Sequence, residues 1–199
     1  PEIRFIPPAR DTLVRLLPPW QALAAFMQWA LEHLPQAILR PFLMSFLTTV
    51  LAPSPALFQS GAILIDKHGR RFCDERDRPA YALPDQPDQV AYILIDRRLA
   101  TLFSAWPNFV STAPGVAYAY IPDYRRSRPD VYTQAASLDE LAEKLGIDAS
   151  ALRASVAEYN ESVQSGKDAA DGSPRPMPLG QAPFTALGPV RAVFVHNEG

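Results

Sequence analysis

A carboxylate, two arginines and a phenol follow one another closely near the middle of the chain, at Glu75, Arg76, Arg78 and Tyr81. An arginine holds a carboxylate or carbonyl oxygen through charge-assisted hydrogen bonds. A tyrosine exchanges a proton when positive charge or hydrogen bonding lowers its pKa from ~10. Arg76, Arg78 and Tyr81 are therefore residue types that can hold an oxygen or exchange a proton, and Glu75 can accept hydrogen bonds.

Each of these residues also has a simpler explanation. Glu75 can be a structural hydrogen-bonding group that holds a turn. Arg76 and Arg78 can be solvated side chains, and Tyr81 can be a packing residue. Both explanations stay open from the sequence alone, because a cluster of charges after a strand is common on protein surfaces.

The segment that precedes these residues should determine where they emerge. Gly61–Ile65 is an apolar run that predicts a strand, Lys67, His68 and Gly69 predict a tight turn, and the residues up to Glu75 predict a second short strand. A hairpin of this kind would deliver the charged residues to a defined place.

The remaining pattern is that of an α+β protein, with a small mixed sheet flanked by helices. Ser137 with Glu140 forms a capping box, and Asp96 and Asp148 are further candidate N-caps. The predicted elements are a strand at 90–95, helices at 97–103, 138–145 and 149–165, a loop at 106–122 with one strand at 116–121, and an exposed linker at 167–182.

Residues 1–54 predict an apolar helical segment. Leu, Ala, Phe, Met and Trp crowd the stretch 13–58, and the prolines within it favour helices at 20–34 and 36–50. Charged residues and prolines break the apolar runs, so a transmembrane helix of ~20 apolar residues is disfavoured. The segment either packs as ordinary core or lines an apolar substrate pocket.

Composition excludes some classes of partner. The net charge of −2 and the pI of about 5.9 argue against nucleic-acid binding. Arg125, Arg126 and Arg128 form a local basic cluster, which we interpret as a solvated loop edge rather than a polyanion site. Cys73 is the only cysteine, which suits a reducing compartment and a cytoplasmic or membrane-peripheral location. No spacing of His and Cys indicates a metal site.

Three ordered segments resemble flavoproteins related to fumarate reductase, succinate dehydrogenase and 3-ketosteroid dehydrogenase. The stretch 61–75 is similar to the family pattern G-A-I-L-V-N-x-x-G-x-R-F-x-N-E. The stretch 137–168 resembles L-x-E-L-A-x-x-x-G-I followed by V-x-x-Y-N and G-x-D. Residues 182–186 and 195–199 resemble the P-F-Y-A strand and the H-x-x-G-G return.

The resemblance implies that residues 1–199 are a single excised cap domain that binds substrate, with a cap core at 55–199 and flanking FAD-binding halves outside the chain. Its family counterpart makes His196, carried by a strand at 190–196, a candidate substrate-binding residue. The proton-donating arginine of fumarate reductases would fall at Pro79. The tyrosine that assists deprotonation in ketosteroid dehydrogenases lies near Tyr81. The resemblance thus implies Tyr81, Arg78 and Arg76 as candidate catalytic residues and Glu75 as a candidate substrate-binding residue.

Two functions from different classes compete. One is the cap of an FAD-dependent oxidoreductase that acts on a C–C bond beside a carbonyl or carboxylate. Its substrate would be a small molecule, and the apolar segment raises a hydrophobic one as an option. The other is a stand-alone binding or interaction module that has the cap fold and no catalytic activity.

We expect the isolated chain to fold but not to retain FAD. No Gly-x-Gly-x-x-Gly follows a strand, and a pyrophosphate needs such glycines at a helix N-terminus. The measurement is the visible spectrum of the purified chain after incubation with FAD and dialysis. A flavin spectrum that survives dialysis would contradict the expectation.

Overall fold

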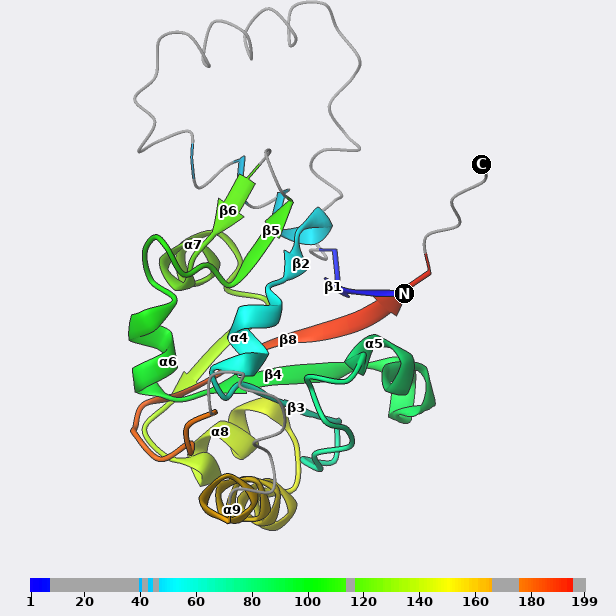
Figure 1. The fold of residues 1–199 in the computed structure, drawn as a ribbon, viewed down its shortest axis with the longest axis vertical. Coiled ribbons are helices and arrows are strands. Elements are labelled where there is room, and N and C mark those ends of the chain that lie inside the picture. The colour runs from blue at the N-terminus through cyan, green and yellow to red at the C-terminus, as the bar shows by residue number, and fades with distance from the viewer. Residues whose placement is uncertain (8–39, 41–42, 45–46, 114–116, 166–175, 195–199) are drawn as a thin grey trace, which may run out of the picture.

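The computed structural model describes residues 1–7, 40, 43–44, 47–113, 117–165 and 176–194. They form an α+β fold with two antiparallel sheets (Figure 1), ordered β1-β8-β4-β3 with β7 also on β8, and β2-β5-β6. The strands are β1 (Glu2–Phe5), β2 (Ala52–Pro53), β3 (Ile63–Ile65), β4 (Ala91–Ile95), β5 (Ser111–Ala113), β6 (Ala117–Ala119), β7 (Tyr132–Ala135) and β8 (Phe184–Val193). The helices are α4 (Pro55–Gln59), α5 (Pro79–Ala82), α6 (Arg97–Leu102), α7 (Ile121–Ser127), α8 (Leu138–Leu145) and α9 (Ala149–Gln164), with 3₁₀ turns η1 (Leu83–Asp85) and η2 (Pro87–Gln89).

Strand β8 holds the larger sheet together. Val190 pairs with both Ala91 of β4 and Phe5 of β1, so these two strands lie on opposite edges of β8. Strand β7 pairs with the first half of β8, on the same edge as β1. At Gly188, with φ of +153°, a Cβ would come within 2.9 Å of the Ala91 carbonyl oxygen, where the β4–β8 register shifts. Glycine is therefore required at this close approach.

The prediction of a mixed sheet is wrong for the described residues, because each strand pair there is antiparallel. The apolar runs of β3 and β4 are almost wholly buried. Continuous apolar runs are typical of strands covered on both faces, as parallel strands usually are. Here the covering comes from helices and loops on both sides of an antiparallel sheet, which strand composition does not reveal.

The predicted hairpin has one strand and one bridge. Strand β3 forms as expected, and the second strand reduces to an isolated bridge between Ile65 and Arg71. The Asp66 carboxylate accepts the backbone N–H groups of His68 (2.8 Å) and Arg70 (2.9 Å) and so closes the turn. Gly69 has φ of +81°, and its carbonyl oxygen accepts the Ser155 hydroxyl at 2.9 Å. The turn therefore packs directly on α9.

The predicted helices after residue 95 are confirmed, together with their caps. Asp96 accepts the Leu99 N–H at 3.0 Å, Ser137 accepts the Glu140 N–H at 3.1 Å, and Asp148 accepts the Ala151 N–H at 2.8 Å. Helix α8 ends at Gly146 in the left-handed conformation. Leu152, Val156 and Tyr159 of α9 are buried.

The stretch 106–122 differs from its prediction as a loop with one strand. It contains β5 and β6, and α7 begins at its end with an N-terminal proline, Pro122. The apolar helices predicted at 20–34 and in most of 36–50 lie outside the described residues, although residues 47–50 are helical. Within the described part of the chain, no helix is long and apolar enough to cross a membrane.

The basic cluster at 125–128 was interpreted as solvated, and for Arg128 this is wrong. Arg128 is fully buried. Its guanidinium donates to the Ile6 carbonyl oxygen at 2.6 Å, to the Thr48 hydroxyl at 3.2 Å and to both carboxylate oxygens of Asp130 at 2.9 Å. Ile6 and Thr48 come from distant parts of the chain, whereas Asp130 is only two residues away, so the local sequence carries no sign of the two partners that bury the guanidinium.

We predict that Arg128→Ala lowers the free energy of unfolding by ~2–5 kcal/mol, because it leaves buried acceptors without a donor. Arg125→Ala removes the same charge from an exposed position on α7 and should stay within ~0.5 kcal/mol of the parent chain. Urea unfolding followed by circular dichroism measures both. Equal midpoints for the two variants would show that the buried arginine has no special structural role.

Candidate functional site

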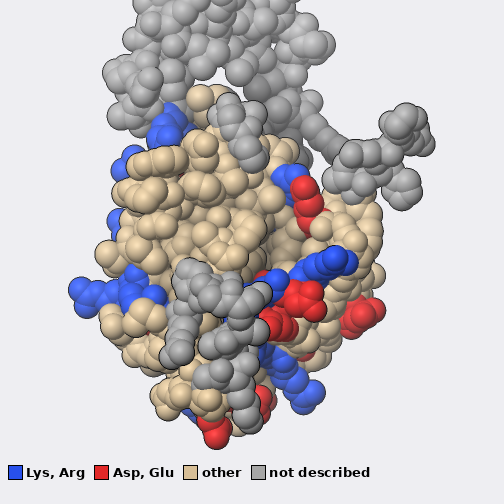
Figure 2. Space-filling model, in the orientation of Figure 1, with Lys and Arg blue, Asp and Glu red and all other residues tan. Residues whose placement is uncertain are grey.

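A pocket of about 510 Å³ opens where four separate segments meet. The pocket is lined by the start of β1, the β2–α4 segment, the residues from Glu75 to Tyr81, and Thr112 of β5. Its size is that of a small-molecule site. Figure 2 shows charged side chains of both signs gathered on the side of the molecule where α5 lies. The pocket wall itself is largely apolar, with Ile3, Pro53 and Phe58 among its residues.

Four of the five residues selected from the sequence line this pocket: Glu75, Arg76, Arg78 and Tyr81. The fifth, His196, lies outside the described residues. The wall residues Ala52 to Phe58 fall within the apolar stretch that was expected either to pack as core or to shape a site. Ile3 and Thr112 had no local signal, because only the pairing of β1 with β8 and of β2 with β5 brings them here.

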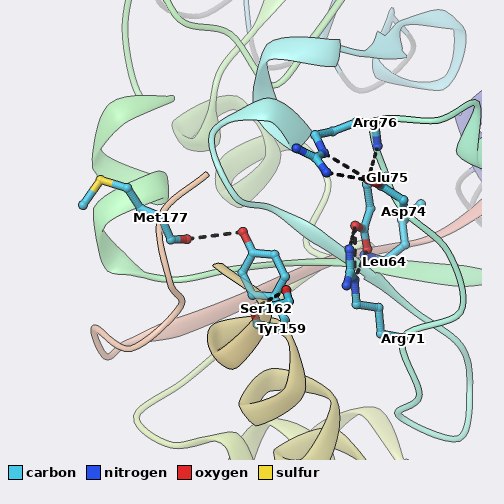
Figure 3. A network of polar contacts seen from close by, with 8 residues as sticks. All are labelled: Leu64, Arg71, Asp74, Glu75, Arg76, Tyr159, Ser162 and Met177. Carbon is cyan, nitrogen blue, oxygen red and sulfur yellow. Dashed lines mark hydrogen bonds and ion pairs between the residues drawn. The ribbon is translucent and has the colours of Figure 1, made fainter. Parts of the chain in front are cut away.

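Glu75 is buried, and its carboxylate holds the segment that lines the pocket in place (Figure 3). Its carboxylate oxygen Oε1 accepts the Leu64 N–H at 2.8 Å, and Arg71 donates to Oε1 and Oε2 at 3.0 and 2.6 Å. The Arg71 guanidinium also lies 5.1 Å from the centre of the Tyr159 ring. Burial raises the pKa of Glu75, while the hydrogen bonds from Arg71 act in the opposite direction. These contacts fasten the segment to both β3 and α9.

Asp74 and Arg76 form a more exposed pair on the other side of the segment. Arg76 donates through Nε to Oδ1 at 3.1 Å and through Nη2 to Oδ2 at 3.0 Å, and its backbone N–H also reaches Oδ1 at 3.0 Å (Figure 3). The side-chain hydrogen bonds from Arg76 lower the pKa of Asp74. The charge of Arg76 is therefore balanced at the pocket wall.

Arg78 and Tyr81 are the other two candidate residues that line the pocket. Arg78 has left-handed backbone angles (φ 47°, ψ 55°) as the N-cap of α5, an unusual conformation for a residue other than glycine. Among the described residues, its guanidinium has no hydrogen bond or ion pair. Tyr81 is 59% exposed. Both residues also line an adjoining open hollow of about 440 Å³. Of the candidate residues, these two offer polar groups that a ligand can engage, and Glu2, Gln59 and Thr112 also line the pocket.

The chemistry open to the pocket follows from these groups. An apolar wall with one available guanidinium and one phenol suits a molecule with an apolar body and a carbonyl or carboxylate oxygen. Burial raises the pKa of the neighbouring Cys73 thiol to about 12, so it stays protonated at neutral pH and is no nucleophile. Three or more His, Cys, Asp or Glu side chains in metal-binding arrangement do not occur in the described ranges.

The described residues do not fit the pyrophosphate of a dinucleotide. Their glycines lie before β3, in the turn after it, at the end of α8, near residue 180 and within β8. None of these positions is a strand-to-helix turn at a helix N-terminus, where backbone N–H groups cradle phosphate. The phosphates of a bound FAD would have to be held by residues outside the described ranges.

Comparison with known proteins supports the motif-based resemblance. No family model matches the chain. It is 29% identical over 139 residues to the NADH:fumarate oxidoreductase of Klebsiella pneumoniae (strain 342), covering 67% of this chain and 13% of that protein. It is 32% identical over 112 residues to a fumarate reductase (cytochrome) of Shewanella frigidimarina, covering 55% of this chain and 17% of that protein. The chain thus spans less than a fifth of the length of these relatives.

Solved structures agree in fold. The open conformation of a flavocytochrome c3 fumarate reductase matches with a TM-score of 0.52 and 27% identity, over 69% of this chain and 22% of that one. The 3-ketosteroid delta1-dehydrogenase of Sterolibacterium denitrificans, in complex with 1,4-androstadiene-3,17-dione, matches with a TM-score of 0.54 and 19% identity, over 71% and 28%. The chain is therefore partially homologous to fumarate reductase flavoproteins. It shares the fold of a region of FAD-dependent oxidoreductases.

We predict that Glu75→Ala destabilises the chain by ~2–5 kcal/mol, because it leaves Arg71 and the Leu64 N–H without their acceptor. Asp74→Ala removes the neighbouring carboxylate from an exposed pair and should cost ~0–1 kcal/mol. Urea unfolding measures the difference. If both variants unfold at the same urea concentration, the buried pair does not anchor the segment.

Proposed function

We propose that the chain is the substrate-binding cap of an FAD-dependent oxidoreductase, which acts on a C–C bond next to a carbonyl or carboxylate. The observation that carries the proposal is the pocket that gathers Arg76, Arg78 and Tyr81 directly after the motif shared with the flavoproteins. Homology to fumarate reductases over 112–139 residues supports the reaction class. The FAD would be held by a flanking domain, and the partner of the pocket is a small molecule.

In such an enzyme the flavin exchanges a hydride with one carbon of the substrate. The protein stabilises charge on the substrate's carbonyl or carboxylate and exchanges a proton with the other carbon. Arg78 binds the substrate's carbonyl or carboxylate oxygen, since its guanidinium has no partner among the described residues. Tyr81 exchanges the proton, helped by the positive charge of Arg78 on the same wall. Arg76 contributes less, because Asp74 already accepts two of its donors. His196 orients the substrate, as its family counterpart does.

A bulky, apolar substrate fits this pocket better than a C4 dicarboxylate. Prolines, Ile3 and Phe58 form much of the wall, and burying apolar surface against them contributes ~25 cal/mol per Å². A dicarboxylate needs positive charge at both ends, whereas one arginine here is already paired. At the position of the fumarate-type arginine stands Pro79, which begins α5 and carries no proton donor.

The test is made in the protein that contains this chain together with its FAD-binding part. We expect turnover of a 3-ketosteroid enone and little or none of fumarate. Tyr81→Phe should lower kcat ~10²–10⁴-fold with little change in KM, because it removes a proton exchanged in the transition state. Tyr132→Phe, in β7 and away from the pocket, is the matched control and should leave kcat unchanged.

Three outcomes would contradict parts of this account. Efficient reduction of fumarate without activity on larger enones would reject the substrate class. Full activity of Tyr81→Phe would reduce Tyr81 to a packing residue. A holoprotein that turns over neither compound and binds no carbonyl ligand in the pocket would favour a binding module without catalysis.

A further inference from the structure

A second surface, separate from the pocket, has an unusual distribution of charge. Residues 99–122 contain no charged side chain, and arginine pairs flank them: Arg97 with Arg98 on one side, Arg125 with Arg126 on the other. This uncharged stretch forms the end of α6, the loop after it, β5, β6 and the start of α7.

The fold brings the two ends of the stretch together. The Ile121 N–H donates to the Phe103 carbonyl oxygen at 3.1 Å, which joins the start of α7 to the end of α6. In Figure 1, α7 and α6 lie one above the other along the same edge of the molecule. Figure 2 shows Lys and Arg side chains following one another along that edge. The two arginine pairs therefore border one surface.

Large apolar side chains protrude between the arginines. Trp106 is 68% exposed and Leu102 is 41% exposed. The Trp106 ring meets Tyr118 edge-on with 5.6 Å between ring centres, and Tyr118 packs on Phe109 at 4.8 Å. One side of the tryptophan ring therefore packs on Tyr118 while most of the ring is exposed to solvent. Exposed aromatic side chains of this kind often contact another surface.

The acidic groups of these elements do not neutralise the surface. Asp96 is fully buried and accepts the Leu99 N–H as the cap of α6. Asp123 is buried and bound by Arg40 through two hydrogen bonds of 2.7 and 2.8 Å. Asp130, just beyond α7, is bound by Arg128. Arg97, Arg125 and Arg126 are exposed, and Arg98 is half-buried with one donor on the Ser60 carbonyl oxygen.

We propose that Arg97, Arg98, Leu102, Trp106, Arg125 and Arg126, here called the arginine–tryptophan surface, bind the face of an anionic lipid bilayer. Tryptophan prefers the boundary between headgroups and acyl chains, and arginines beside it pair with lipid phosphates. Each arginine near an anionic bilayer strengthens binding by about 5-fold. An acidic protein could also pair with the arginines and pack on the tryptophan. The stretch 99–122, which carries no charge, favours the bilayer, because uncharged side chains can enter the acyl-chain boundary without burying a charge.

The direct test is sedimentation of the chain with vesicles of phosphatidylcholine, either pure or with about a third phosphatidylserine, at ~0.1 M salt. We expect binding to the anionic vesicles and loss of binding at ~1 M salt, where the screening length falls to ~3 Å. Arg125→Ala/Arg126→Ala should lower the partition coefficient ~25-fold. Arg70→Ala/Arg191→Ala changes the net charge equally at exposed positions elsewhere and should leave binding unchanged.

A second readout follows the tryptophan itself. In a Trp20→Phe/Trp29→Phe variant, Trp106 is the only tryptophan, and its fluorescence should shift to the blue when anionic vesicles are added. Absence of vesicle binding, or an equal loss in the Arg70/Arg191 control, would overturn the proposal. Binding to polyglutamate but not to vesicles would assign the surface to an acidic protein instead. These vesicle experiments do not involve residues of the pocket. Their outcome therefore neither supports nor contradicts the function proposed above.

Discussion

The buried contact between Arg71 and Glu75 determines where the candidate site lies. A carboxylate removed from water is costly unless charged donors and backbone N–H groups surround it. Glu75 meets this requirement with Arg71 and the Leu64 N–H, and Arg71 in turn lies over the Tyr159 ring. The segment that follows is thereby fixed relative to β3 and α9. Arg76, Arg78 and Tyr81 emerge from that fixed point.

The rest of the pocket depends on strand pairing between distant parts of the chain. Strand β8 lies between the N-terminal strand β1 and β4 and joins them in one sheet, and β2 pairs with β5. These pairings put Ile3, Phe58 and Thr112 around the same hollow. The charged residues Glu75, Arg76 and Arg78 come from one short segment, whereas Ile3, Pro53 and Phe58 of the apolar wall come from two others. Substitutions in the apolar wall could therefore change which substrate binds without altering the charged residues.

The pocket and the arginine–tryptophan surface use arginine in two ways. At the pocket, Arg78 has no ion-pair partner among the described residues and lies beside an apolar wall. A single charged group in such a position can orient a small molecule. On the edge formed by α6 and α7, several arginines surround an exposed tryptophan over a broad area. The fully buried Arg128 serves neither purpose and instead joins Ile6, Thr48 and Asp130. Position in the fold, rather than residue type, separates these roles.

The sequence by itself determined the features that depend on near neighbours. The caps at Asp96, Ser137 and Asp148, the turn at Gly69 and the strand around Ile93 each need only a few adjacent residues. The cluster from Glu75 to Tyr81 was visible for the same reason. Tertiary structure alone decided the antiparallel sheet, the burial of Arg128 and the wall residues Ile3 and Thr112. These features rest on contacts between segments far apart in the chain, and the free energy of such contacts is absent from any local pattern.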